Sequence, residues 1–258
     1  MITAGIDCGA KNTKTIIIKD GKIIGKGKRL TGFDQKQAVE KSLKEAIQAA
    51  AGIARDGVQR ICGTGSGKNA IFMADDDVDD IKAMSKGAHY FFPNARTVVD
   101  VGAEEGRAAK MDESGNPIDF AINEKCAAGA GAFIEAMARA LEVTLEEMGF
   151  LCLQSVKDIP MNAQCVIFAE SEVVGLIHAK TDKPDISKAI HDSMASRIVS
   201  MIRRIGVNED IAMIGGVGYN SGFMAAMLRE LKVEKIYIPD EPEYGAAVGA
   251  AVVAAEEA

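Results

Sequence analysis

The chain contains the same strand, turn and strand pattern twice, and this internal repeat limits its possible folds more than any other feature. The first copy is an apolar segment that ends in an Asp-x-Gly triplet at residues 7–9 and continues into a second apolar segment. The second copy ends in an Asp-x-Gly triplet at residues 100–102 and again continues into a second segment. A further turn rich in Asp and Gly follows each copy, which is typical of another hairpin. The repeat therefore predicts a duplicated domain.

Helical and strand patterns alternate along the rest of the chain. Apolar residues recur with the period of a helix in four segments, which are residues 35–55, 127–141, 186–205 and 246–255. Short apolar runs predict strands at residues 59–61, 97–101, 211–214 and 235–238. This alternation predicts an α/β fold in which helices cover the sheets. We expect two α/β domains, residues 1–95 and 96–243, with the last helix, in residues 244–258, returning to the first domain.

Charge and composition narrow the classes of partner. The net charge of −7, with no basic stripe, argues against nucleic acid as a partner. No apolar run is long enough to span a membrane, and the start of the chain reads as a strand instead of a secretion signal. We therefore expect a cytoplasmic protein without a membrane partner. Its five cysteines, which include no CxxC pair, are then expected to be reduced thiols or metal ligands.

The two Asp-x-Gly turns have the chemistry of a phosphate site. Gly9 and Gly102 allow the backbone to approach a phosphate closely, and the N–H groups that follow can donate to its oxygens. Asp7 and Asp100 stand where a carboxylate can hold Mg²⁺, mostly through water. Lys14 either turns inward to meet phosphate charge or is a solvated strand lysine. One such triplet is a common turn, but two in matching contexts favour a nucleotide site.

A third motif adds a surface for the rest of a nucleotide. An apolar strand ends in Gly215 and Gly216, and Asn220 follows shortly after. Residues without side chains offer a flat surface to an adenine and a ribose. The alternative is an ordinary glycine turn after a core strand. Beside two phosphate turns, the nucleotide interpretation is favoured.

The order of these motifs resembles that of a known superfamily. Two Asp-x-Gly turns, a Gly-Gly turn and the segment at residues 243–251 resemble the actin/Hsp70/hexokinase superfamily across essentially the whole chain. The resemblance implies a duplicated actin-like, ribonuclease H-like ATPase fold with the nucleotide cleft between two α/β domains. A P-loop is excluded, because the glycines and lysine at residues 63–68 have the wrong spacing. We expect that segment to be a connecting turn between the halves.

Two cysteine segments, residues 123–133 and 164–172, narrow the resemblance. They are similar to the cluster-binding segments of the BadF/BadG/BcrA/BcrD-type ATPases, which include activators of 2-hydroxyacyl-CoA dehydratases and ATPase subunits of benzoyl-CoA reductase. In that family, two cysteines from each of two subunits hold one [4Fe–4S] cluster, which matches the usual shell of four thiolates. The resemblance implies that Cys126 and Cys165 are the ligands here. The remaining cysteines are expected to be small core residues: Cys8, Cys62 and Cys152.

The turn after Asp100 distinguishes two branches of this family. Glu104 stands where the dehydratase activators carry a glutamine. On this difference we favour an ATPase subunit that delivers low-potential electrons to benzoyl-CoA reductase, with a dehydratase activator as the alternative. Glu104 either positions water or acts as a base. A sugar-type kinase and a non-catalytic actin-like scaffold are the rivals from other classes.

The resemblance also implies a set of cofactors and partners. The cofactors are ATP or ADP, Mg²⁺ and the [4Fe–4S] cluster. The partners are a second ATPase subunit, in a homodimer or a paralogous heterodimer, an acyl-CoA reductase or dehydratase component, and a ferredoxin-like electron donor.

Overall fold

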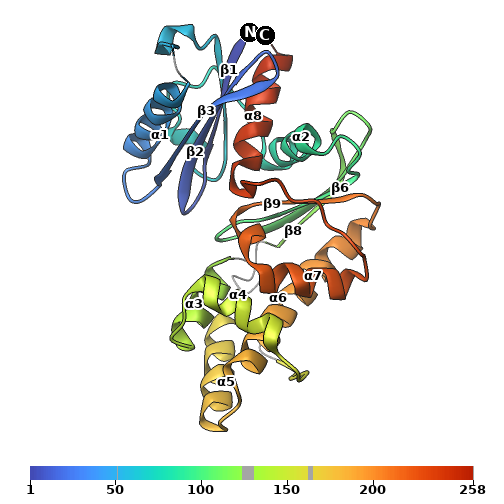
Figure 1. The fold of residues 1–258 in the computed structure, drawn as a ribbon. Helices are drawn as coiled ribbons and strands as arrows, with labels where there is room; N and C mark the ends of the chain where they lie inside the picture. Colours follow the sequence, from blue (N-terminus) through green and yellow to red (C-terminus); the bar gives the residue numbers. More distant parts are fainter. Residues whose placement is uncertain (51, 124–130, 162–164, 258) are drawn as a thin grey trace.

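Two sheets with the same strand order form the frame of the structure. The computed structural model describes residues 1–50, 52–123, 131–161 and 165–257, and Figure 1 shows them as two halves joined end to end. The five-stranded sheet has the order β3-β2-β1-β4-β5, and the four-stranded sheet has the order β8-β7-β6-β9. The strands are β1 (Ile2–Cys8), β2 (Asn12–Lys19), β3 (Lys22–Leu30), β4 (Arg60–Thr64), β5 (Asp76–Asp77), β6 (Thr97–Val101), β7 (Gly106–Met111), β8 (Pro117–Asn123) and β9 (Ile211–Ile214).

Each sheet is an antiparallel meander with a parallel strand added beside its first strand. β1 pairs antiparallel with β2 and parallel with β4, and β6 pairs antiparallel with β7 and parallel with β9. This shared topology confirms the predicted α/β fold with a duplicated unit. The prediction of a strand at residues 235–238 is wrong. In this segment the structure has one isolated parallel bridge, between Tyr237 and Ala212. That bridge lies beyond β9, as β5 lies beyond β4.

The helices fill the connections between the strands. They are α1 (Gln35–Ala49), α2 (Asp80–Phe91), α3 (Gly131–Ala140), α4 (Leu145–Gln154), α5 (Val166–His178), α6 (Lys183–Ile205), α7 (Ser221–Leu231) and α8 (Gly245–Glu256). Short 3-10 turns occur at Arg55–Gly57, Lys68–Ala70, Gly216–Tyr219 and Pro242–Tyr244. The helix expected at residues 35–55 ends early, before Gly52 at φ +84°. Residues 127–130 of the expected helix at 127–141 lie outside the described residues. None of the described helices is long and apolar enough to cross a membrane.

Alternating strand side chains bury both faces of each sheet. In β2, Ile17 packs with α1, whereas Ile16 and Ile18 on the opposite face pack with α8. In β6, Val98 packs with α2, whereas Val99 faces the large core beneath α6. Because strand side chains alternate between faces, one run of apolar residues serves two layers. The first sheet therefore lies between α1 and α8, and the second between α2 and α6 (Figure 1).

The central layer consists of α2 and α8, whose backbones touch. A Cβ added to Gly249 would lie 1.7 Å from the carbonyl oxygen of Ala83, and one added to Gly87 would lie 1.9 Å from that of Gly245. Only glycine allows such close approach. α2 precedes the second sheet in the chain and packs on it, whereas α8 ends the chain and packs on the first sheet. The proposed division into residues 1–95 with 244–258 and residues 96–243 stays a prediction.

Candidate functional site

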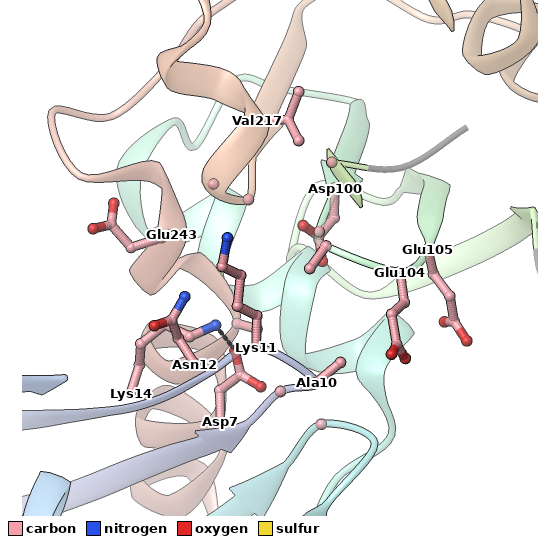
Figure 2. Close-up of a pocket in the computed structure, with 18 of the residues that line it drawn as sticks. Asp7, Ala10, Lys11, Asn12, Lys14, Asp100, Glu104, Glu105, Val217 and Glu243 are labelled. Carbon is pink, nitrogen blue, oxygen red and sulfur yellow. Dashed lines mark hydrogen bonds and ion pairs between the residues drawn. The ribbon is translucent and has the colours of Figure 1, made fainter. Parts of the chain in front are cut away.

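A cavity of about 580 Å³ lies between the turns that follow β1 and β6, where the two halves face each other (Figure 2). Its walls come from both sheets, from α3 and from the segments around β9. The predicted catalytic and nucleotide-binding residues all line it. They are Asp7, Gly9, Lys14, Asp100, Gly102, Glu104, Gly215, Gly216 and Asn220.

The first turn brings an aspartate and a lysine together. Asp7 stands directly opposite Lys14 in the antiparallel pairing of β1 and β2. The Lys14 Nζ donates a hydrogen bond of 2.5 Å to Asp7 Oδ2, and the lysine side chain is only 13% exposed. Of the two alternatives for Lys14, the structure therefore has the inward one. Burial lowers the pKa of Lys14, but the Asp7 carboxylate outweighs it and raises that pKa above its ordinary value.

The second turn repeats this arrangement with an arginine. Asp100 stands directly opposite Arg107 in the pairing of β6 and β7, and Arg107 Nη1 lies 3.6 Å from Asp100 Oδ2. The guanidinium also lies 2.7 Å from Glu105 and 3.5 Å from Asp80, the first residue of α2. Burial raises the pKa of the Asp100 carboxyl, and Arg107 opposes that rise. Sequence reasoning missed Arg107 as a site residue, although its spacing from Asp100 equals that of Lys14 from Asp7.

A glycine with positive φ is seated against each aspartate. Gly65 has φ +93° and Gly215 has φ +88°, a conformation that side chains disfavour. A Cβ on Gly65 would lie 2.5 Å from Asp7 Oδ1, and one on Gly215 would lie 2.3 Å from Asp100 Oδ1. Gly65 follows β4, the parallel neighbour of β1, and Gly215 follows β9, the parallel neighbour of β6. Each aspartate and its glycine therefore meet at the carboxyl ends of two parallel strands, where ligands of such sheets bind.

This arrangement corrects one prediction. The segment at residues 63–68 is not a connecting turn between the halves. It contains the end of β4 in the first sheet and the turn after it, and it contributes Gly65 and Ser66 to the cavity. The physical reason is that β4 is the parallel neighbour of β1, so its end reaches the same edge of the sheet as Asp7.

Carboxylates outnumber bases around the cavity. Among the described residues, eight acidic and four basic side chains line it. Its far end holds Glu243, which accepts a hydrogen bond of 3.2 Å from Lys28 Nζ. Asn220 there also caps α7, because its Oδ1 accepts a 2.9 Å hydrogen bond from the N–H of Phe223. Such an acidic cavity can accept a polyphosphate only together with a cation. Mg²⁺ fits, because it binds one or two carboxylates together with phosphate oxygens and water.

The cysteines fall into two environments. Cys126 lies outside the described residues. Cys165 is half-buried and forms the N-cap of α5, where helix amides and the helix dipole favour an anionic group. Its position fits a ligand of an anionic cluster. Burial raises the pKa of the Cys62 thiol to about 12, which disfavours the thiolate that binds metal. The others of the three expected core cysteines, Cys8 and Cys152, are also buried.

Comparison with known proteins identifies the family. Residues 4–254 match the model of the BadF/BadG/BcrA/BcrD ATPase family. The chain belongs to this family. Membership of the BadF/BadG/BcrA/BcrD family over almost the whole chain supports ATP hydrolysis over the sugar-type kinase and the non-catalytic scaffold.

Similar members of the BadF/BadG/BcrA/BcrD family include dehydratase activators. The activator of lactoyl-CoA dehydratase from Anaerotignum propionicum is 35% identical over 258 residues, covering 100% of this chain and 99% of that protein. The crystal structure of (R)-2-hydroxyglutaryl-CoA dehydratase component A from Acidaminococcus fermentans has a TM-score of 0.95 at 33% identity, covering 100% of this chain and 98% of that one. The 2-hydroxyisocaproyl-CoA dehydratase activator from Clostridium difficile, solved with bound ADPNP, has a TM-score of 0.92 at 33% identity, covering 100% and 95%.

A more distant structure extends the likeness of fold. A ROK family glucokinase from Streptomyces griseus, solved with glucose and AMPPNP, has a TM-score of 0.63 at 12% identity, covering 99% of this chain and 100% of that one. The predicted actin-like fold of the hexokinase type is confirmed.

The two branches of the family are not equally similar to the chain. A benzoyl-CoA reductase subunit from Thauera aromatica is 29% identical over 262 residues, covering 97% of this chain and 92% of that protein. The dehydratase activators are more similar, at 33–35%. The comparisons therefore support the alternative, a dehydratase activator, better than the benzoyl-CoA reductase interpretation that Glu104 favoured.

Proposed function

We propose that this protein is an ATP-hydrolysing activator of a 2-hydroxyacyl-CoA dehydratase, which couples ATP hydrolysis to delivery of a low-potential electron. The observation that carries the proposal is the pair of matching turns, each with an aspartate, a base across the hairpin and a glycine pressed against the carboxylate. These turns face one cavity, and the similar activators support the partner class.

The residues of the cavity then take separate roles. Asp7 and Asp100 would hold Mg²⁺, which would neutralise part of the phosphate charge. The backbone at Gly9 and Gly102 donates to phosphate oxygens. Glu104 positions the attacking water or takes its proton.

The turn that follows β9 accepts the rest of the nucleotide. Gly215 lies against Asp100, and Gly216 after it presents backbone without a side chain to the adenine and ribose. Asn220, whose side chain caps α7, lines the same part of the cavity. Lys14 holds Asp7 in place and adds positive charge behind the first turn.

The electron-transfer part of the proposal rests on Cys126 and Cys165. With the same two cysteines of a second ATPase subunit, in a homodimer or a paralogous heterodimer, they would complete four thiolate ligands. A [4Fe–4S] cluster held there would carry one electron from a ferredoxin-like donor to the dehydratase component. We also propose a cytoplasmic location and no nucleic-acid partner.

Anaerobic iron and sulfide analysis of cysteine variants tests this part. We expect Cys126→Ala and Cys165→Ala to lose the iron and the electron paramagnetic resonance signal of the reduced protein, while Mg·ATP binding persists. Cys62→Ala is the control and should keep its iron, because its buried thiol is no ligand. If Cys126→Ala and Cys165→Ala both kept a full cluster, the electron-transfer proposal would be wrong.

The partner class needs a second assay. Addition of the protein, ATP and a reductant to a 2-hydroxyacyl-CoA dehydratase component should start dehydration. If the protein instead stimulated benzoyl-CoA reduction by a benzoyl-CoA reductase component, the assignment to the benzoyl-CoA reductase branch of the family would be supported.

A further inference from the structure

An ion pair crosses the cavity between the two halves. Lys11 belongs to the turn between β1 and β2, and its Nζ donates to Glu135 Oε1 on α3. Both residues line the cavity, and Figure 2 shows the Lys11 side chain extending into it. The side chains are 46% and 28% exposed. Exposed pairs contribute little to stability and are therefore easily exchanged for a stronger partner.

Lys11 differs from the other described bases of the cavity. Lys14 and Arg107 are largely buried and held by the aspartates opposite them. Lys28 is paired with Glu243 at the far end. Of the four bases that line the described part of the cavity, Lys11 alone belongs to one of the two turns that follow Asp7 and Asp100. It lies between Gly9 and Asn12.

The backbone of this turn is fixed. The carbonyl oxygen of Lys11 accepts a 3.0 Å hydrogen bond from Thr31 N–H, and Gly9 N–H donates to the carbonyl of Asn12 at 3.2 Å. The side chain of Lys11 can therefore change partner while its turn stays in place.

The helix that carries Glu135 is attached to the second turn. Gly131 N–H donates to the carbonyl of Gly102 at 2.8 Å, and Ala132 N–H donates to that of Ala103 at 2.9 Å. The ion pair ties the same helix to the first turn. A nucleotide whose phosphates lie between the turns thus meets Lys11 while Lys11 is held by a single carboxylate. A terminal phosphate carries more negative charge than that carboxylate and attracts the ammonium more strongly.

We propose that Lys11 leaves Glu135 for the terminal phosphate of ATP, and that this exchange distinguishes ATP from ADP. The proposal rests on the nucleotide site proposed above. ADP lacks the terminal phosphate, so the ion pair to Glu135 persists with ADP. With ATP, α3 loses its tie to the first half and keeps its hydrogen bonds to the second turn. α3 follows the segment that contains Cys126, so the exchange occurs next to a proposed cluster ligand in the chain.

Binding of Mg·ADPNP and Mg·ADP to three forms of the full chain tests the exchange. We expect Lys11→Ala to lower ADPNP affinity about tenfold, the usual loss for a hydrogen bond to a charged group, and to leave ADP affinity within about twofold. Glu135→Gln removes the competing charge and should raise ADPNP affinity about two- to fivefold, which is the range for an exposed pair.

A matched ion pair outside the cavity supplies the control. Lys82 and Glu257 lie 3.7 Å apart and are similarly exposed, so Lys82→Ala and Glu257→Gln should change neither affinity. Equal loss of ADPNP and ADP binding in Lys11→Ala, or no loss, overturns the exchange while leaving the nucleotide site intact. A wild-type protein that binds neither nucleotide overturns the proposed function itself, and the exchange with it.

Discussion

Replacement of Gly249 by alanine tests the backbone contact between α2 and α8. The new Cβ would lie 1.7 Å from the carbonyl oxygen of Ala83 and 2.7 Å from the nitrogen of Gly87. Ordinary contact between such atoms requires roughly 3.5 Å, so the two helices must move apart. The obstacle is backbone, which cannot rotate aside as a side chain can.

The size of the effect follows from this geometry. Extra methyl groups in well-packed cores cost about 1–3 kcal/mol, and a clash with backbone belongs at the upper end. Alanine is the better helix former by about 1 kcal/mol, which offsets only part of the loss. We expect Gly249→Ala to lower the free energy of unfolding by about 2 kcal/mol. For a chain of this size, the melting temperature then falls by roughly 4–8 °C.

Calorimetry of Gly249→Ala and one matched variant checks this reasoning. Gly175 also lies in a helix, α5, but a Cβ there would meet nothing within 4 Å. Gly175→Ala should therefore raise the melting temperature by about 2–4 °C, since only helix propensity changes. If Gly249→Ala had the melting temperature of the wild type, or if both variants changed the melting temperature in the same direction, the contact between α2 and α8 would not be as tight as described.

Three further predictions concern the site and the pH response. Asp100→Asn should lower Mg²⁺-dependent ATP hydrolysis by about a hundredfold or more in a phosphate-release assay, because the metal loses a carboxylate; wild-type turnover would remove Asp100 from the site. Glu104→Gln should keep ATP binding and still hydrolyse ATP at a changed rate, and loss of nucleotide binding would make Glu104 structural. Burial lowers the pKa of His191 to about 4, below its ordinary value of about 6.5. Stability from His191 is thus present above pH 6.5 and is lost as pH falls towards 4, by about 3 kcal/mol, and urea midpoints of His191→Gln should show a weaker fall than the wild type over that range.

The sequence was informative where a local pattern determines the structure. The strands at residues 97–101 and 211–214 match β6 and β9 to the residue, because short apolar runs bounded by turns fit strands that are buried on both faces. The helix expected at residues 186–205 begins earlier, at Lys183, since Pro184 suits the first turn of a helix.

Other elements depend on information that a local pattern lacks. The helix α5 was not predicted, because apolar residues lie on its exposed side as well as its buried side, which hides the helical period. Gly65 was missed as a site residue because it stands in the run Gly63-Thr64-Gly65-Ser66-Gly67, which differs from the Gly-Gly turn at Gly215. Only the pairing of β4 with β1 shows that the two glycines are equivalent. Arg107 has the same spacing from Asp100 as Lys14 has from Asp7, and its register opposite Asp100 shows that this spacing places it in the site.

The contact between α2 and α8 joins the two halves of the structure. At their closest approach the two backbones meet without a side chain between them, and the ion pairs of Lys82 with Glu257 and of Lys86 with Glu256 also join the helices. Each helix is fixed to a different sheet, α8 also through Thr3 Oγ1, which donates to the carbonyl of Ala251 at 2.9 Å. Figure 1 shows α5 at the end of the molecule farthest from this contact. A change in the angle between α2 and α8 would therefore move α5, which Cys165 caps, farther than it would move the residues beside the contact.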